Sequence, residues 1–255
     1  MRGESALLIL FIHIYYYLFI TLSPGGLIGG GSIPKPGEVT LAHRGILFLD
    51  ELPEFPRQVL EVMRQPLEDR IVTISRSKAV FQFPANIMLA ASLNPCPCGY
   101  FGHEYGDKHC ICSATLISRY RSKISGPLLD RIDLQLEVPR PISLDHHLSG
   151  PSLNTAQMKL MVQKARDFRE ARTADSCFNS AAELTGAALR KAILIKPEAV
   201  SLLENAFEAL GISMRAYDRM LKLARTIADL EESDFVEAAH IAEAIQFRGL
   251  DKPLP

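Results

Sequence analysis

Two short apolar runs, each followed by polar residues, dominate the first half of the chain. Residues 45–49 read GILFL and lead into Asp50 and Glu51, and residues 86–93 read NIMLAASL and lead into Asn94. Parallel strands are buried on both faces, so such runs predict neighbouring strands of a parallel α/β sheet. Ligands of these sheets bind where the strands end, so the three polar side chains are predicted to face one site.

The surrounding residues predict a helix, a hairpin and a loop. Residues 55–69 have apolar positions at helical spacing, and the helix is predicted to end near Pro66 because proline lacks a backbone N–H. Residues 70–84 hold two β-rich runs on either side of residues 76–78, which predicts a β-hairpin. The glycine- and proline-rich residues 25–39 predict a flexible connection.

From residue 154 onward the apolar positions follow the helical period, which predicts an all-α lid after the α/β core. Asn154 and Ser213 stand where helix N-caps are expected, and Gly211 ends the helix between them. The last helix is predicted to start at Ser233 or Asp234.

These patterns divide the chain into four parts. Residues 25–140 are predicted to form the partial core, residues 141–153 a linker, and residues 154–255 the lid, after a hydrophobic leader at 1–24. The apolar stretch 6–22 is about 17 residues long, the lower limit for a membrane span. Three interpretations stay open for it: a leader that reflects a truncated or wrongly started gene, a membrane or signal segment, and a buried strand or helix.

The composition is that of an ordinary globular protein. The net charge is −1 and charged residues make up 22% of the chain, so any contact with a nucleic acid or a membrane must come from a local patch. Arg76 and Lys78, at the tip of the predicted hairpin, are the candidates for contacting DNA phosphates. The alternative is that they form a solvated turn.

Four of the five cysteines lie in two C-x-C pairs separated by eleven residues. They are Cys96, Cys98, Cys110 and Cys112. Four thiolates in two close pairs can surround a tetrahedral Zn²⁺, with His103 and His109 as substitute ligands. The alternatives are free thiols or one disulfide. The odd number of cysteines and their clustering argue against a secreted disulfide framework.

The two acids after the first apolar run match a motif of nucleotide-hydrolysing enzymes. An apolar strand followed by Asp-Glu is the Walker B pattern of nucleotide hydrolases, in which Asp50 would hold Mg²⁺ and Glu51 would orient or deprotonate the attacking water. Asn94, at the end of the second strand, would hydrogen-bond that water or the terminal phosphate. The alternative is that the two acids only cap the next helix.

Longer stretches of the sequence carry a family resemblance. They are GLIGGGSIPKPGEVTLAHRGILFLDELPEF, LNPCPCGYFG, RYRSKISGPLLDRIDLQLEVP and ARTIADLE. From about Gly25 to its end, the chain resembles the later part of the magnesium-chelatase-like AAA+ ATPases of the ComM/YifB type. This resemblance implies a ring-forming, hexameric ATPase with an α/β parallel-sheet core and a helical lid, using ATP and Mg²⁺ in the bacterial cytoplasm.

The resemblance also assigns roles to single residues. It matches Asp50 and Glu51 to Walker B, Asn94 to sensor 1, Arg131 in LLDRID to the arginine finger, and Arg215 in SMRAYDR to sensor 2. The finger would reach the terminal phosphate bound by a neighbouring protomer. Taken without the resemblance, Arg131 is predicted to form a surface ion pair with one of the aspartates beside it, Asp130 or Asp133.

One family motif is missing from the 255 residues. No G-x-x-x-x-G-K-[ST] phosphate loop occurs in the sequence, and residues 1–24 do not resemble the family. We therefore expect a fragment of a longer ATPase, which by itself is a poor nucleotide binder and inactive as an enzyme.

Three functions stay open on the sequence alone. The first is an ATP-driven DNA motor for branch migration in the recombination of incoming DNA. The second is a magnesium-chelatase-like subunit for metal insertion. The third is a catalytically dead interaction fragment. A membrane partner is expected only if residues 6–22 are a true membrane segment.

Overall fold

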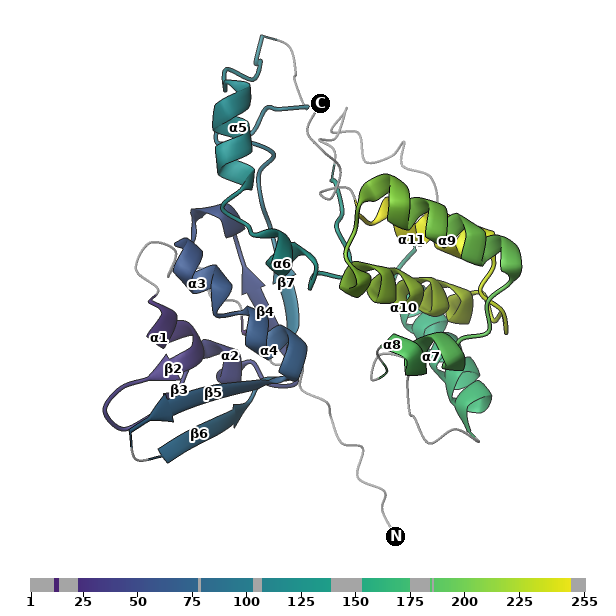
Figure 1. The fold of residues 1–255 in the computed structure, drawn as a ribbon, viewed down its shortest axis with the longest axis horizontal. Coiled ribbons are helices and arrows are strands. Elements are labelled where there is room, and N and C mark those ends of the chain that lie inside the picture. The colour runs from purple at the N-terminus through teal and green to yellow at the C-terminus, as the bar shows by residue number, and fades with distance from the viewer. Residues whose placement is uncertain are drawn as a thin grey trace. The chain divides into compact units, whose positions relative to one another are not determined.

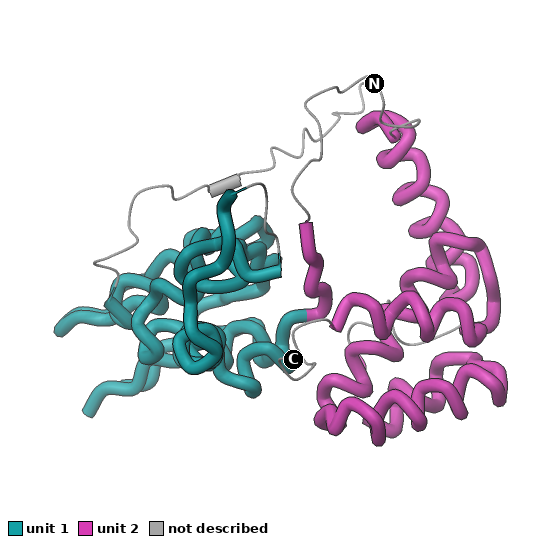
Figure 2. The backbone as a smooth tube through the Cα atoms, turned by 90° about the horizontal axis from the view of Figure 1, so that it is seen from above, with its two compact units in different colours: residues 1–132 teal, residues 133–255 magenta. Residues whose placement is uncertain are grey.

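The computed structural model describes most of the chain, and two compact units divide it after Ile132 (Figure 2). The described ranges are 12–13, 23–77, 79–102, 107–138, 153–174, 184 and 186–248. The predicted leader is therefore described only for the backbone of two residues and from residue 23 on, and the predicted linker only at Leu153. Lys78 and His103 also lie outside the described residues. Within the described part, no helix is long and apolar enough to cross a membrane.

Unit 1 is built on a parallel sheet of three strands (Figure 1). The central strand β4, Ile46–Leu49, pairs on one side with β1, Ile12–His13, and on the other with β7, Met88–Ala91. Leu47 and Leu49 of β4 are buried at 2% and 5% exposure and belong to the main apolar core. The parallel pairing predicted for the two apolar runs is confirmed.

The segment predicted as a flexible connection contains short regular elements. They are α1, Pro24–Ile28; β2, Gly29–Gly30; β3, Lys35–Pro36; and α2, Glu38–Leu41. A Cβ atom at Gly29 would lie 2.2 Å from the carbonyl oxygen of Lys35, and one at Gly37 would lie 2.3 Å from the backbone nitrogen of Gly29. The glycines therefore allow two backbone segments to pack in direct contact. The glycine- and proline-rich composition did not predict these regular elements.

The helix predicted after the acids is interrupted. The structure has a 3₁₀ turn at Leu52–Glu54, then α3, Arg57–Glu61, and α4, Arg64–Asp69. Pro66 is the third residue of α4 and does not end it, so that prediction was wrong. The first-turn N–H groups of a helix have no partner within it, so a proline there removes no helical hydrogen bond.

The hairpin predicted at 70–84 is confirmed. Strand β5, Ile71–Arg76, pairs antiparallel with β6, Ala79–Pro84, and Arg76 stands opposite Ala79 across the turn. The described part of unit 1 also contains two later helices: α5, Ala114–Arg121, and α6, Gly126–Leu129.

Unit 2 is helical, as predicted (Figure 1). Its helices are α7, Thr155–Thr173; α8, Gly186–Ala192; α9, Pro197–Leu210; α10, Met214–Leu230; and α11, Ala238–Gln246. The side chains of Asn154 and Ser213 cap α7 and α10, and Gly211 ends α9 in the left-handed region, as expected.

The start predicted for the last helix was wrong. Helix α11 begins at Ala238, and Nδ1 of the buried His240 accepts the backbone N–H of Glu237 at 3.0 Å. The other ring nitrogen of His240 lies 2.9 Å from the carboxylate of Glu231. Histidine thus closes a capping box in which sequence patterns expect Glu or Gln.

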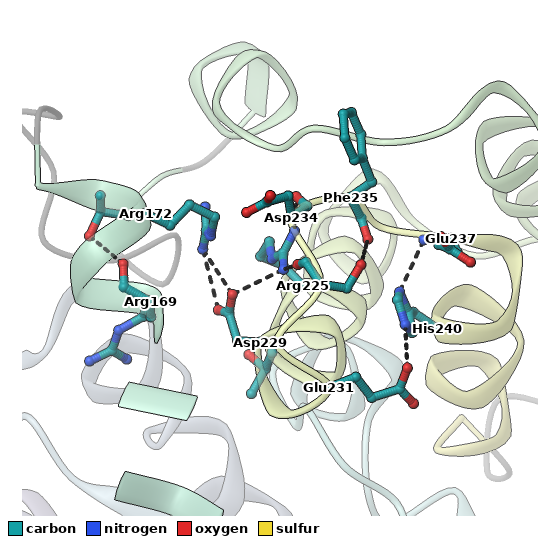
Figure 3. A network of polar contacts seen from close by, with 12 residues as sticks. Arg169, Arg172, Arg225, Asp229, Glu231, Asp234, Phe235, Glu237 and His240 are labelled. Carbon is teal, nitrogen blue, oxygen red and sulfur yellow. Dashed lines mark hydrogen bonds and ion pairs between the residues drawn. The ribbon is translucent and has the colours of Figure 1, made fainter. Parts of the chain in front are cut away.

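A buried charge network joins α7 to α10 in unit 2 (Figure 3). The carboxylate of Asp229 accepts from Arg172 at 3.1 Å and lies 3.0 Å from the guanidinium of Arg225, whose side chain is only 1% exposed. Burial lowers the pKa of Arg225, and Asp229 opposes that effect. Arg225 also donates to the backbone carbonyls of Ser233 and Asp234, which fixes the turn after α10.

Asp229→Asn is expected to destabilise unit 2 strongly. The change removes the charge shared by two guanidinium groups, and breaking a buried pair typically costs about 3–5 kcal/mol. Urea unfolding followed by circular dichroism measures the effect. Lys196→Met is the control, because it breaks a half-exposed pair with Glu237 and should barely move the midpoint. Equal shifts for the two variants would contradict the prediction.

Candidate functional site

The two acids after β4 stand beside the end of β7. Glu51 donates its backbone N–H to Oδ1 of Asp50 at 3.1 Å and to Oγ of Ser92 at 3.1 Å, and the Ser92 hydroxyl donates to the same Asp50 oxygen. The backbone pairing continues past the strands, because Ser92 donates to Leu49 at 3.0 Å and Leu52 donates to Ser92 at 2.8 Å. The Asp50 carboxylate is thereby oriented from the neighbouring strand.

Ser92 is a site residue that the sequence analysis did not find. It lies inside an apolar run, and a serine in such a run carries no signal by itself. The parallel register, which places Leu49 opposite Ala91, brings Ser92 next to Asp50. Only the pairing of the two strands could have identified it.

Glu51 has a backbone conformation that is uncommon for a residue with a side chain. Its φ of 52° and ψ of 49° lie in the left-handed region, which costs energy and is frequent at functional sites. It occupies the N-cap position of the 3₁₀ turn, but its side chain makes no capping hydrogen bond. The structure therefore does not support the alternative in which Glu51 serves as a helix cap, and it leaves the exposed carboxylate turned to solvent.

Asn94 lies three residues beyond the end of β7, with an exposed side chain. Tyr120 of α5 lies near the backbone of Asn94. Burial raises the pKa of Tyr120, and the nearby carboxylates of Glu54 and Glu51 raise it further. The phenol therefore lies close to both the acids after β4 and the backbone after β7.

The four cysteines meet in one cluster. Their sulfur atoms all lie within 4.8 Å of one another. Sγ of Cys96 is 3.3 Å from that of Cys98 and 3.8 Å from that of Cys110, and Cys98 is 3.7 Å from Cys110. Tetrahedral zinc with Zn–S bonds of about 2.3 Å separates its sulfur ligands by about 3.8 Å. The four sulfurs therefore fit a zinc ion, and the exposed His109 is not needed as a fourth ligand.

The thiols of the cluster are electrostatically unequal. The backbone N–H of Tyr100 lowers the pKa of Cys98 to about 6. The N–H of Cys112 favours the thiolate of Cys110, but partial burial and the sulfurs of Cys98 and Cys96 outweigh it and raise the pKa of Cys110 to about 12. Crowded sulfurs cannot all ionise without a cation among them, and a bound dication would supply that charge.

Arg131 is buried, and its partner is not one of the adjacent aspartates. Its side chain is 6% exposed, pairs with Glu68 of α4, and donates to the carbonyl oxygen of Pro127 at 2.5 Å. Asp133 instead accepts from Arg219 in unit 2. The predicted surface pair was wrong, because the chain turns after α6 and directs the guanidinium toward α4.

Arg131 also lines a cavity of about 380 Å³ in unit 1. The lining combines acidic, basic and apolar side chains: Ile28, Glu61, Val62, Arg64, Gln65, Glu68 and Arg131. Within the described part of the chain, Nε of Arg131 has no hydrogen-bond partner. The guanidinium therefore keeps one buried donor without a hydrogen bond.

Two further predicted residues lie on other elements, Arg76 on β5 and Arg215 on α10. Arg76 donates from Nε and Nη2 to the carbonyl of Gly31 at 3.2 and 3.1 Å, which ties the β5–β6 hairpin to the β2–β3 turn. Arg215 is exposed in the first turn of α10 in unit 2. The roles predicted for Arg76, Arg215 and the other site residues remain predictions.

Two consecutive parts of the chain match two families, and both families are named after the ChlI subunit of magnesium chelatase. Residues 15–146 match the family described as magnesium chelatase, subunit ChlI, and residues 152–248 match the ChlI C-terminal family. The first match begins inside the apolar N-terminal stretch.

Full-length relatives are similar over most of the chain. The protein YifB of Salmonella typhimurium, described as uncharacterized, is 39% identical over 231 residues, and YifB of Escherichia coli is 38% identical over 231 residues. The competence protein ComM of Haemophilus influenzae is 41% identical over 225 residues. These alignments cover 88–89% of the chain but 43–44% of each relative, so the chain spans less than half the length of the curated relatives it matches.

Proposed function

Since the chain belongs to the magnesium-chelatase-like family, in its ComM and YifB type, we propose that it forms part of a ring-shaped AAA+ ATPase that moves DNA. The reaction would be ATP-driven translocation or branch migration during the recombination of incoming DNA. The observation that carries the proposal is the arrangement at the sheet edge, where Ser92 beyond β7 orients Asp50 beyond β4.

Each residue of that edge has a role in the proposal. Asp50 would hold Mg²⁺ with the carboxylate that Ser92 orients, and the bound ion neutralises phosphate charge. The exposed Glu51 would polarise the attacking water, and Asn94 would hydrogen-bond it. Arg131 would contact the phosphate of a neighbouring protomer, and Arg215 would contact nucleotide from the lid. The 255 residues hold no phosphate loop, so we expect the chain alone to hydrolyse no ATP.

The four cysteines would hold one structural zinc ion. Sulfur separations of 3.3–3.8 Å match a four-thiolate tetrahedron. All four ligands come from the protein, so no position is left for a substrate. Zinc would therefore stabilise the loop between β7 and α5 and take no part in catalysis.

A second function rests on the name of the matched family. Magnesium chelatase subunits suggest a role in inserting a metal into a porphyrin, in which the ring would contact a chelatase partner and not DNA. The ComM name of one relative and the cysteine cluster favour the DNA motor.

The DNA proposal predicts a phosphate contact at the β5–β6 hairpin. Arg76→Ala combined with Lys78→Ala should weaken DNA binding equally for different sequences and lower the salt slope by about 2, because each lost phosphate contact removes about one unit. Fluorescence anisotropy across a salt series measures both effects.

The control removes the same charge elsewhere. Lys159→Ala with Lys164→Ala takes two exposed lysines from α7 and should leave the slope unchanged. Arg76 also donates hydrogen bonds to the carbonyl oxygen of Gly31, so its loss affects stability as well as charge. Melting curves of both variants separate the two effects. Unaltered DNA binding by the hairpin variant would rule out this contact, and no DNA binding by the unmutated chain would favour the chelatase or interaction readings.

A further inference from the structure

Two contacts inside unit 1 hold the side chain of Arg131. Nη1 donates to the carbonyl oxygen of Pro127, four residues earlier, at 2.5 Å, and Nη2 pairs with the carboxylate of Glu68 on α4. The first contact closes the turn after α6, because an arginine near the end of a helix can bind its last carbonyl groups. The second contact joins Arg131 to another element of the unit.

These contacts keep the guanidinium of Arg131 inside its own chain. The side chain of Arg131 is 6% exposed, whereas that of Glu68 is 41% exposed. An arginine finger that acts on a neighbouring protomer must present its guanidinium at the surface, where the transferring phosphate can reach it. For the proposed finger, the conformation in the structure is therefore a withdrawn one.

The withdrawn position leaves part of the guanidinium unsatisfied. Within the described residues, the buried Nε of Arg131 makes no hydrogen bond. A buried donor without a partner costs free energy, and exposure to water removes that cost. The carboxylate of Glu68 offsets the cost by its charge, and it is exposed enough to be hydrated when the arginine leaves. The ion pair therefore controls the balance between a withdrawn and a released Arg131.

A second acid of the same cavity has a different partner. Glu61 lines the cavity together with Glu68 and Arg131, but its carboxylate pairs with Nη1 of Arg64 at 2.9 Å. The side chains of the two acids are similarly exposed, at 31% for Glu61 and 41% for Glu68. They differ in which arginine they bind, so Glu61 provides a matched control for Glu68.

We infer that Glu68 is a positioning residue, which holds Arg131 in the withdrawn position until a phosphate of the neighbouring protomer replaces its carboxylate. The inference rests on the proposed function, in which Arg131 is the arginine finger. Carboxylates and phosphates bind the planar guanidinium in the same way, so one anion can take the place of the other. Only chains with a released Arg131 can engage a neighbour, which weakens the apparent affinity of the finger. Glu68 thereby favours activation of protomers that already carry nucleotide.

Chemical modification of Arg131 tests the inference without ATP. The arginine-selective reagent phenylglyoxal is added to the full chain, and the rate at Arg131 is followed by mass spectrometry. Glu68→Gln should speed the modification about fivefold to tenfold, because a neutral amide binds a guanidinium less strongly than a carboxylate does. Glu68→Lys should speed it further by repulsion. Glu61→Gln should leave the rate unchanged, since Glu61 pairs with Arg64.

Activation of a partner ATPase gives the second arm. The chain is mixed with a full-length relative that carries a phosphate loop but lacks its own arginine finger, and ATP hydrolysis is measured at increasing chain concentration. Glu68→Gln should lower the half-maximal concentration about fivefold to tenfold with little change in maximal turnover, because it raises the fraction of chains with a released Arg131. Glu61→Gln should match the unmutated chain.

The two arms separate the positioning role from the finger itself. Melting curves first establish that the variants are folded. Equal modification rates in the unmutated chain, Glu68→Gln and Glu68→Lys would overturn the positioning role. Faster modification with an unchanged half-maximal concentration would overturn its effect on activation. A mixture that stays inactive with every variant would contradict the proposed finger instead, while the modification rates would still decide whether Glu68 holds Arg131.

Discussion

Protein purified without chelator is expected to contain one zinc ion per chain. The ligands are Cys96, Cys98, Cys110 and Cys112, whose sulfurs lie within 4.8 Å of one another. Structural zinc contributes on the order of 10 kcal/mol in small zinc domains, so its removal should lower the melting temperature of unit 1 strongly. Metal analysis by mass spectrometry and thermal melting, with and without chelator, measure the two effects.

Single substitutions separate the cluster from other thiols. Cys96→Ser should abolish zinc binding, because Cys96 is fully buried and no solvent ligand can replace it. Cys177→Ser is the matched control, since Cys177 is the one cysteine outside the two C-x-C pairs, and it should retain the metal. Metal-free protein with four freely titratable thiols and unchanged stability would reject the zinc site.

Arg131→Ala is expected to abolish trans-activation of a partner ATPase. The assay mixes the chain with a full-length, phosphate-loop-bearing relative whose own arginine finger has been removed. The chain alone should show no hydrolysis, and the mixture should regain activity once mixed rings form. Losing an arginine finger typically lowers turnover by about 10³–10⁵, so Arg131→Ala in the mixture should return activity to the baseline.

The buried environment of Arg131 requires further variants. Arg131→Ala also removes the partner of Glu68 and the bond to Pro127, at a cost of about 1–3 kcal/mol. Arg131→Lys keeps a charge opposite Glu68 but loses the planar fork that contacts phosphate, so it should fold and still fail to activate. Glu68→Gln keeps the guanidinium and should still activate.

Two results would contradict the finger. Ring formation is checked first, by size-exclusion chromatography with light scattering. If mixed rings form and Arg131→Lys activates as well as the unmutated chain, the guanidinium does not contact the transferring phosphate. Activity lost in Glu68→Gln as well would assign Arg131 a structural role in its cavity.

Local sequence patterns determined the main elements of both units. Continuous apolar runs predicted β4 and β7, and helical spacing predicted the bundle, because burial and backbone period depend on neighbouring residues. Caps at Asn154 and Ser213 and the stop at Gly211 were also predictable, since each satisfies backbone groups within one turn. The two C-x-C pairs predicted a candidate metal site. The fold brings the four sulfur atoms within 4.8 Å of one another, close enough to bind one shared ion.

Contacts between residues far apart in sequence were decided by tertiary structure alone. Ser92 reaches Asp50 through strand register, and Arg121 reaches Pro95 through the path of α5. Arg131 has acids on both sides in the sequence, yet the end of α6 turns it toward Glu68, sixty-three residues earlier. Side-chain direction depends on the packing of whole elements, and one-dimensional spacing does not contain that information.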